Sequence, residues 1–371
     1  MSYIYQRPLH GKSIGVVFGS FAPLHKGHID LIMKAKKEND GGCIVIVCGY
    51  DGDKGEPIIP HNKRYRYVRE YFKDDEMVAV FPVNDTKIGA NAYPDGWEVW
   101  LKEFFNIWNV AVTPVSKEAK RVWYVGDPNY HFDLEKRGEC AILVNRMLNP
   151  ISATMIRANP YKYWDMMAYT FHGAFSHNIL ITGTASEGKT TLVKDLGKYF
   201  NTTYSHEMPR DYMEEMCVHD TELDAVDFLS FLQGQYNLNR KMINSPLNKG
   251  VFFADTDALV TQMYAKYYAM DDTCKMTKDD YYMVVSHVAH ALTKRSRWDK
   301  IFVLIPHGNF VNDNSRYMEH SGMKERMELY KILESFLIAH GLMEKVTILT
   351  GDYYENYLAI KEYTEGVLNH G

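Results

Sequence analysis

The sequence predicts two consecutive α/β domains, each built on a doubly wound parallel sheet. Short apolar runs alternate with helical patterns along the 371 residues, and this alternation is typical of parallel sheets with helices on both faces. Two glycine-containing segments, residues 19–28 and 183–190, each follow such a run and open a helical pattern. Because a helix N-terminus directs backbone N–H groups at an anion, the sequence predicts two phosphate-binding sites.

The first domain is expected to span residues 1–170. Its apolar run at residues 43–48 lacks period-2 alternation, which favours a strand buried on both faces. A helix at residues 161–170 is expected to close the domain, and residues 171–178 are expected to link it to the second. The expected strands are residues 14–18, 43–48, 78–82, 122–125 and 141–144.

The second domain is expected to span residues 179–371 and to repeat the same scheme. A short strand is expected just before residue 205, in addition to four apolar runs. These runs are residues 179–182, 251–254, 301–305 and 346–349.

The composition excludes several classes of protein. The net charge of −5 lacks the basic excess of a nucleic-acid binder. The basic run at residues 63–69 is interpreted as mainly a solvated helix face, with one or two arginines in reach of a nucleotide phosphate. No apolar run approaches the roughly 18 residues that cross a membrane, and no signal peptide is visible, so we expect a cytoplasmic protein without membrane insertion. The five scattered cysteines favour buried thiols over zinc or disulfides.

The first motif, GSFAPLHKGH at residues 19–28, indicates nucleotidyl transfer. Its histidines, His25 and His28, are three residues apart, so one helical turn places both side chains on the same side. Two imidazoles together with helix N–H groups can stabilise charge on an α-phosphate. Gly19, Ser20 and Phe21 are expected to let the backbone approach the nucleotide.

A second segment, ISATMIR at residues 151–157, follows the fifth expected strand. Together the two segments resemble the HxGH nucleotidyltransferase family. Its adenylyl-transferring members hold the ATP phosphates at a helix N-terminus and with an arginine, which implies binding roles for Ser152, Thr154 and Arg157. A guanidinium is suited to such a clamp. The resemblance also implies nucleotide contacts for Gly126 and Asp127.

The segment YPDGW at residues 93–97 indicates which class of substrate the first domain binds. A tryptophan after a Pro/Gly turn can present its face to a cationic ring, although Trp97 taken alone is more typical of a core residue. The residue pattern of this segment resembles that of the bifunctional bacterial nicotinamide-nucleotide adenylyltransferase/nicotinamide riboside kinase family (NadR). That resemblance implies that Trp97 contacts nicotinamide.

The second motif, GTASEGKT at residues 183–190, satisfies the phosphate-loop pattern GxxxxGK[ST]. Lys189 is expected to pair the β- and γ-phosphates of ATP, and Thr190 to hold Mg²⁺. The residues expected to contact the nucleotide at this loop are Gly183, Ser186, Glu187, Gly188, Thr190 and Thr191.

Phosphoryl transfer also needs a metal-side acid and a group that orients the acceptor hydroxyl. Asp255 and Asp257 end a buried apolar run; Asp255 is expected at the metal and Asp257 at the substrate. Glu207 is expected to act as a base or ribose ligand, and Arg210 to contact an anion. Which of the three carboxylates is base and which is metal ligand stays open.

The family resemblance implies three further contacts. His206 stands where relatives often carry an aromatic residue beside the substrate. The segment DNSR at residues 313–316 resembles the family's lid, which implies a substrate role for Asp313 and a nucleotide role for Arg316 and Arg326. The family's N-terminal helix-turn-helix block is not expected in this chain, and neither is repression through it.

The resemblance implies a bifunctional enzyme of NAD salvage. The second domain would phosphorylate nicotinamide riboside to nicotinamide mononucleotide with ATP and Mg²⁺, and the first would convert that mononucleotide and ATP to NAD and pyrophosphate. One alternative is a fusion of phosphopantetheine adenylyltransferase and dephospho-coenzyme A kinase. Another is a nucleotide-sensing module with a silent site. A homo-oligomer and a functional link to a riboside transporter stay open.

Overall fold

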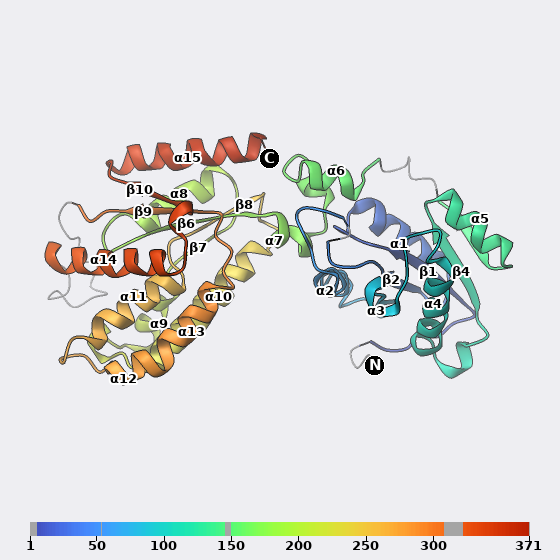
Figure 1. Ribbon diagram of the computed structural model, residues 1–371, viewed down its shortest axis with the longest axis horizontal. Helices are drawn as coiled ribbons and strands as arrows, with labels where there is room; N and C mark the ends of the chain where they lie inside the picture. Colours follow the sequence, from blue (N-terminus) through green and yellow to red (C-terminus); the bar gives the residue numbers. More distant parts are fainter. Residues whose placement is uncertain (1–5, 53, 145–149, 308–321, 371) are drawn as a thin grey trace. The chain divides into compact units, whose positions relative to one another are not determined.

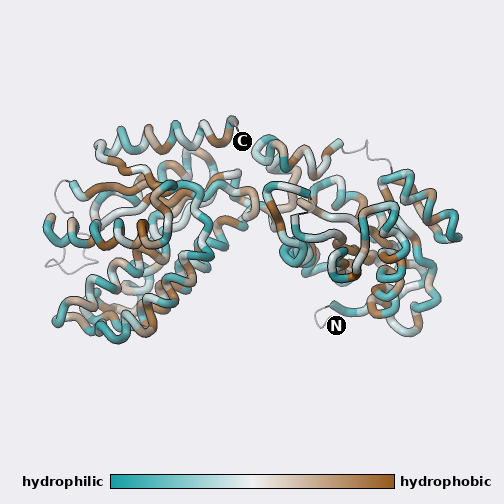
Figure 2. Tube along the Cα trace, viewed as in Figure 1, coloured by the Kyte–Doolittle hydropathy of each residue, from teal (hydrophilic) through white to brown (hydrophobic). Residues whose placement is uncertain are grey.

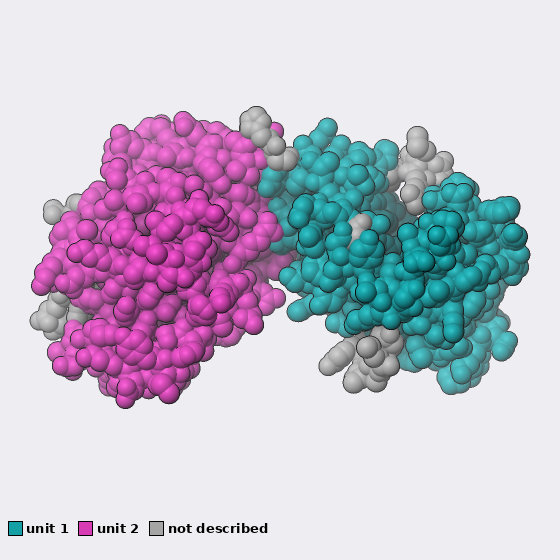
Figure 3. All heavy atoms as spheres, in the orientation of Figure 1, with its two compact units in different colours: residues 1–175 teal, residues 176–371 magenta. Residues whose placement is uncertain are grey.

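Two α/β units make up the chain, residues 1–175 and 176–371 (Figure 3). The computed structural model describes residues 6–52, 54–144, 150–307 and 322–370. Each unit contains one five-stranded sheet in which every strand pair is parallel (Figure 1). The predicted fold class is therefore confirmed.

The sheet of the first unit has the strand order β3-β2-β1-β4-β5. All five expected strands are present, with ends that shift by one or two residues. Their bounds are β1 Ser13–Gly19, β2 Cys43–Val47, β3 Val78–Pro82, β4 Lys120–Val125 and β5 Cys140–Leu143. The helices are α1 Lys26–Glu38, α2 His61–Tyr71, α3 Asp85–Ile88, α4 Trp97–Ala111, α5 Pro128–Lys136, α6 Ala153–Ala158 and α7 His172–Phe175.

Helices cover both faces of this sheet because successive strand side chains point to opposite faces. In β1, Val17 belongs to one apolar cluster with residues of α1 and α2, whereas Val16 belongs to another with residues of α4. Figure 2 shows apolar residues concentrated along the strands. The sheet is buried on both faces, as its apolar runs predicted.

The end of the first unit differs from expectation. The helix predicted at residues 161–170 is wrong: two 3₁₀ turns, Trp164–Met166 and Tyr169–Phe171, occupy this stretch. The turns carry the chain back to the first motif, where the Ala168 N–H donates to the Leu24 carbonyl at 2.9 Å and Met167 forms a β-bridge with His25. Part of the expected linker, residues 172–175, is instead helix α7.

The sheet of the second unit has the strand order β10-β9-β6-β8-β7. All five expected strands are present. Their bounds are β6 His177–Gly183, β7 Tyr204–Ser205, β8 Val251–Ala254, β9 Lys300–Leu304 and β10 Val346–Leu349. The helices are α8 Lys189–Tyr199, α9 Met208–Met216, α10 Ala225–Ile243, α11 Ala258–Ala269, α12 Lys278–Asp280, α13 Ser286–Thr293, α14 Met323–Ala339 and α15 Tyr353–His370, with a π-helical turn at Tyr281–Val285.

Two helical layers and a helical extension surround this second sheet. Helices α8 and α15 pack on one face, and α11 and α14 pack on the other. Helices α9, α10, α11 and α13 share a third apolar cluster of their own, which lies beside the sheet (Figure 1). Helices α9, α10 and α11 of this layer contribute walls to the pocket described below.

Candidate active sites

The first candidate site lies where β1 ends and α1 begins. The stretch from β1 to α1 brings together His25, the N-cap residue of α1, and His28 in its first turn. Their rings stack with centroids 3.7 Å apart, so the predicted juxtaposition is present. Phe21 is fully buried and lies edge-on to His28 at 5.0 Å. Its side chain supports the histidine and does not offer a free surface to a nucleotide.

Arg157 on α6 joins this loop from a distant part of the sequence. Its Nη1 donates to the Ala22 carbonyl at 2.6 Å, and its Nη2 donates to the Thr154 hydroxyl at 3.2 Å. Ser152 caps α6 by accepting the Met155 N–H at 3.2 Å. The ISATMIR segment therefore places a guanidinium beside the histidine loop.

The position of the loop in the sheet is also informative. The chain runs from β1 outward through β2 and β3, then crosses to β4 on the other side of β1. The switch point thus lies between β1 and β4, and ligands of doubly wound sheets bind at the carboxyl ends of strands there. Gly126 and Asp127 follow β4 at this edge. The Asp127 carboxylate accepts the Asn129 N–H at 2.9 Å and caps α5.

Sequence analysis missed the role of Arg64, which belongs to the basic run of α2. This side chain is fully buried, so it does not belong to a solvated helix face. Its guanidinium donates to the carbonyls of Ser20 at 2.9 Å, Cys48 at 3.3 Å and Tyr50 at 2.8 Å. Arg64 therefore ties the loop after β1 to the loop after β2.

The structure places Trp97 in the core of the first unit. Its side chain is only 3% exposed, and its ring stacks on Tyr130 with an interplanar angle of 11°. Phe18 and Tyr93 also contact it. Stacking on a ligand ring would require these neighbours to move, so the geometry does not support the contact expected from the resemblance.

The second candidate site lies at the phosphate loop between β6 and α8. Gly183 has φ +147°, and a Cβ there would lie 2.6 Å from the Leu304 carbonyl oxygen; Gly188 has φ +76°. Both positions therefore require glycine. Lys189 begins α8 and is buried, with its Nζ donating to the Thr184 carbonyl at 2.6 Å. The two glycines of the motif thus lie where the backbone needs them.

A carboxylate and a hydroxyl meet beside this loop. The Thr190 hydroxyl donates to Oδ2 of Asp255 at 2.7 Å, and Asp255 is fully buried. Burial and the neighbouring Glu207 carboxylate raise the pKa of Asp255 to about 7. Its other oxygen, Oδ1, is buried without a hydrogen-bond donor among the described residues. A cation beside Asp255 and Thr190 would satisfy both features.

The described residues contain no cluster of three or more His, Cys, Asp or Glu side chains that could hold a metal. Magnesium at a nucleotide site takes one or two protein carboxylates and completes its shell with phosphates and water. Asp255 and Thr190 therefore fit Mg²⁺ that arrives with ATP.

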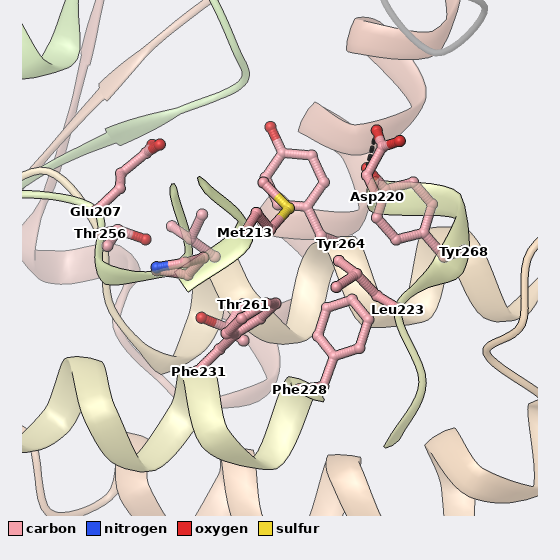
Figure 4. Close-up of a pocket in the computed structure, with 12 residues that line it drawn as sticks. Glu207, Met213, Asp220, Leu223, Phe228, Phe231, Thr256, Thr261, Tyr264 and Tyr268 are labelled. Atoms are coloured by element: carbon pink, nitrogen blue, oxygen red, sulfur yellow. Dashed lines mark hydrogen bonds between the residues drawn. The ribbon is translucent and has the colours of Figure 1, made fainter. Parts of the chain in front are cut away.

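Glu207 lies between two cations and lines a pocket. Its Oε1 is 3.9 Å from Nζ of Lys189, and its Oε2 is 3.5 Å from Nη2 of Arg210. Figure 4 shows the pocket, which extends from Glu207 between the helices of the second unit. A hydroxyl compound in this pocket would meet a carboxylate beside the lysine of the phosphate loop.

The pocket combines aromatic walls with two acids. It is a feature that sequence analysis missed, because its walls come from three helices, α9, α10 and α11, and from the turn before α10. The lining residues are Glu207, Pro209, Met213, Asp220, Leu223, Phe228, Phe231, Thr256, Val260, Thr261, Tyr264 and Tyr268.

Two residues expected at the substrate are used differently. The Asp257 carboxylate is buried, accepts the Trp298 Nε1–H at 2.7 Å and caps α11 through the Leu259 N–H at 2.9 Å. Burial raises the pKa of Asp257 to about 6. His206 is turned to Asp211, 2.5 Å from Nε2. Neither side chain lines the pocket.

Two residues expected at the kinase nucleotide, Glu187 and Arg326, bind each other. The buried guanidinium of Arg326, on α14, forms an ion pair with the Glu187 carboxylate inside the phosphate loop. His307 also approaches Glu187, with its Nδ1 3.0 Å from Oε2. The guanidinium of Arg326 thus lies against the phosphate loop, and its contact with the nucleotide stays a prediction. Asp313 and Arg316 lie outside the described residues.

The described helices include none that is long and apolar enough to cross a membrane. Fold and sites together define a two-domain phosphotransferase: a nucleotidyltransferase with paired histidines, followed by a phosphate-loop kinase. Family models agree, because residues 16–159 match a cytidylyltransferase-like domain and residues 178–356 match an AAA domain.

The chain belongs to the NadR family. It is 32% identical to the trifunctional NAD biosynthesis/regulator protein NadR of Salmonella typhimurium, over 97% of this chain and 85% of that protein. Identity to the NadR protein of Escherichia coli is 28%, over 96% and 83%. A crystal structure of a NadR protein in complex with NR superposes with a TM-score of 0.81 at 34% identity, over 96% of this chain and 97% of that one. Another, in complex with NAD and AMP-PNP, gives 0.79 at 33% identity, over 97% and 98%.

Proposed function

We propose that this chain carries out two successive steps of NAD synthesis from nicotinamide riboside. The second unit transfers the γ-phosphoryl group of ATP to the 5′-hydroxyl of the riboside, which gives nicotinamide mononucleotide and ADP. The first unit joins that mononucleotide to the AMP moiety of a second ATP, which gives NAD and pyrophosphate. The observation that supports this most directly is that the chain, with its histidine pair and its phosphate loop, matches NadR along nearly its whole length.

In the kinase step, the acceptor hydroxyl lies at the Glu207 end of the pocket. The Glu207 carboxylate orients this hydroxyl and accepts its proton as the new P–O bond forms. Lys189 neutralises the β- and γ-phosphates from the adjacent loop. Asp255 and Thr190 would hold Mg²⁺, which would supply neutralisation of the phosphate charge.

In the adenylyl-transfer step, a phosphate oxygen of the mononucleotide attacks the α-phosphorus of ATP and pyrophosphate leaves. No general base is needed, because the attacking oxygen is already ionised. His25 and His28 stabilise the charge that develops on the α-phosphate. Arg157, held at the Ala22 carbonyl, binds the leaving phosphates beside them.

Further parts of the proposal concern the setting of the enzyme. ATP as co-substrate of both steps favours a cytoplasmic location. A homo-oligomer and a link to a riboside transporter stay predictions.

The direct test follows both products in one reaction. Purified protein is incubated with nicotinamide riboside, ATP and Mg²⁺, and the mixture is separated by anion-exchange chromatography. Nicotinamide mononucleotide should appear first and NAD later, with ADP and pyrophosphate in matching amounts. Formation of NAD from added mononucleotide, without any conversion of the riboside, would contradict the proposed kinase activity while leaving the adenylyltransferase in place.

A further inference from the structure

The charged side chains that line the pocket of the second unit are all acidic, and Lys189 and Arg210 contact the one at its Glu207 end. Its twelve lining residues include two carboxylates, Glu207 and Asp220, and no lysine, arginine or histidine. The remaining lining is apolar or aromatic apart from threonine hydroxyls. A pocket of this kind favours a ligand that carries a positive charge, because a carboxylate is most effective where water is excluded.

The two carboxylates stand at different ends of the pocket. Glu207 lies beside Lys189 of the phosphate loop, so its end receives the hydroxyl that is phosphorylated. Figure 4 shows Asp220 on the other side of the pocket, beyond Met213 and Tyr264. The part of the substrate that lies farthest from the reacting hydroxyl therefore approaches Asp220.

Asp220 is buried and firmly oriented. The residue is only 3% exposed. The Tyr268 hydroxyl donates to its Oδ2 at 3.1 Å, and the Thr221 N–H donates to its Oδ1 at 3.0 Å. These donors fix the carboxylate beside the aromatic wall, which includes Phe228 and Tyr264.

The chemistry of pyridine ribosides gives this arrangement a purpose. The ring of nicotinamide riboside is a pyridinium cation, which is attracted to aromatic faces and to a nearby carboxylate. The corresponding riboside of nicotinic acid has the same ring but carries a carboxylate in place of the amide. The Asp220 carboxylate would repel this carboxylate of the ligand inside the pocket.

We propose that Asp220 is a specificity-determining residue of the kinase. Its carboxylate favours binding of nicotinamide riboside and disfavours binding of the riboside of nicotinic acid. The proposal rests on the proposed riboside kinase activity and adds to it the residue that reads the charge of the ring. Asp220 acts on the substrate directly, and its distance from the phosphate loop separates this role from the transfer step at Glu207 and Lys189.

The test compares the two ribosides in wild type and in Asp220→Asn. The asparagine keeps the size and the acceptor oxygen but removes the charge. The kcat/KM for nicotinamide riboside should fall on the order of tenfold, mainly through a higher KM, because the loss of a single modest ionic contact corresponds to about one factor of ten. The kcat/KM for nicotinic acid riboside should rise. The KM for ATP should stay near the wild-type value.

Asp224→Asn is the matched control. Asp224 is an exposed N-cap of α10 in the same stretch, does not line the pocket, and caps as well in its amide form. It should leave the ratio of the two ribosides unchanged. Tyr268→Phe removes the hydroxyl that donates to Asp220 and keeps the charge of Asp220. It should therefore lower kcat/KM for both ribosides, and nicotinamide riboside should stay the preferred substrate.

Binding of each riboside, measured by calorimetry without ATP, gives a second readout that does not depend on turnover. An unchanged ratio of the two ribosides in Asp220→Asn, in both kinetics and binding, would overturn the role of Asp220. Failure of wild type to phosphorylate either riboside would instead contradict the proposed kinase activity, and the binding ratio would still decide the role of Asp220.

Discussion

The guanidinium of Arg326 is ion-paired with the carboxylate of Glu187, 139 positions earlier in the chain and inside the phosphate loop. Both side chains are buried. Arg326 also donates to the His307 carbonyl at 3.1 Å. The Glu187 carboxylate thus holds two parts of the chain against the phosphate loop. One is α14, through Arg326, and the other is His307, which follows β9.

We predict that Glu187→Gln destabilises the second unit. Removal of one partner from a buried ion pair leaves an uncompensated charge, which costs about 3–5 kcal/mol. Thermal unfolding should show a lower Tm for this variant, and Arg326→Met should act similarly. The double variant should lose less than the sum of the two. Strictly additive losses would show that the pair contributes no coupling.

The two activities should be separable by single substitutions, because each site has its own sheet and helix terminus. Loss of one preorganised donor costs on the order of 10²–10³ in rate. Lys189→Ala should stop riboside conversion and spare the step from mononucleotide to NAD, whereas His28→Ala should let mononucleotide accumulate. Chromatography of products checks both. If either substitution abolished both steps in a folded protein, the two-site model would be wrong.

The Mg²⁺ requirement of the kinase should depend on pH through Asp255. Its pKa of about 7 lies above the ordinary value, so the protonated fraction grows as the pH falls through 7, and bound metal must displace that proton. The Mg²⁺ concentration for half-maximal rate should rise between pH 8 and pH 6. Asp255→Asn should need more Mg²⁺ and lose this pH dependence. Wild-type Mg²⁺ dependence in the variant would remove Asp255 from the metal site.

Substitution of Arg64 should harm the first unit selectively. Arg64→Met removes the donor of three carbonyls, and the loss at the buried Cys48 carbonyl alone costs about 1–3 kcal/mol. The rate of NAD formation from mononucleotide should fall, with the kinase step unaffected. Arg66→Met, on the exposed side of the same helix, is the control. Equal behaviour of the two variants would contradict a positioning role for Arg64.

Trp97 offers a choice between core and ligand contact. Its burial predicts that Trp97→Ala lowers the stability of the first unit by about 3–5 kcal/mol, as for other large core truncations. Denaturant unfolding measures this directly. A several-fold rise in KM for the mononucleotide without loss of stability would instead restore the contact with the nicotinamide ring.

Much of the fold could be predicted because its signals are local. The strand at residues 43–47 is an unbroken apolar run, and both phosphate motifs lie between a strand and a helix, as their patterns require. The failure at residues 161–170 has a physical cause. These residues pack as short turns because Ala168 and Met167 bond to the histidine loop, and no local pattern reveals such a long-range contact.

The sites show the same limit. Thr190 and Asp255 were each assigned to Mg²⁺ from the sequence, and the structure places their side chains in contact. Arg64 was misplaced, although His61 and Val68, at helical spacing from it, are also buried, and this shared face was the available signal. Asp220 gave none, because its place in the pocket depends on a hydrogen bond from Tyr268, which lies 48 residues later in the chain.

The bond from Ala168 to Leu24 has a consequence for how the two activities can be recombined. The family match of the first unit ends at residue 159, yet the following residues back the loop that carries His25. A gene split or an exchange of the kinase at residue 159 would remove that backing from the adenylyltransferase. The natural module therefore ends after Phe175, and a different partner enzyme fused there would leave the first activity intact.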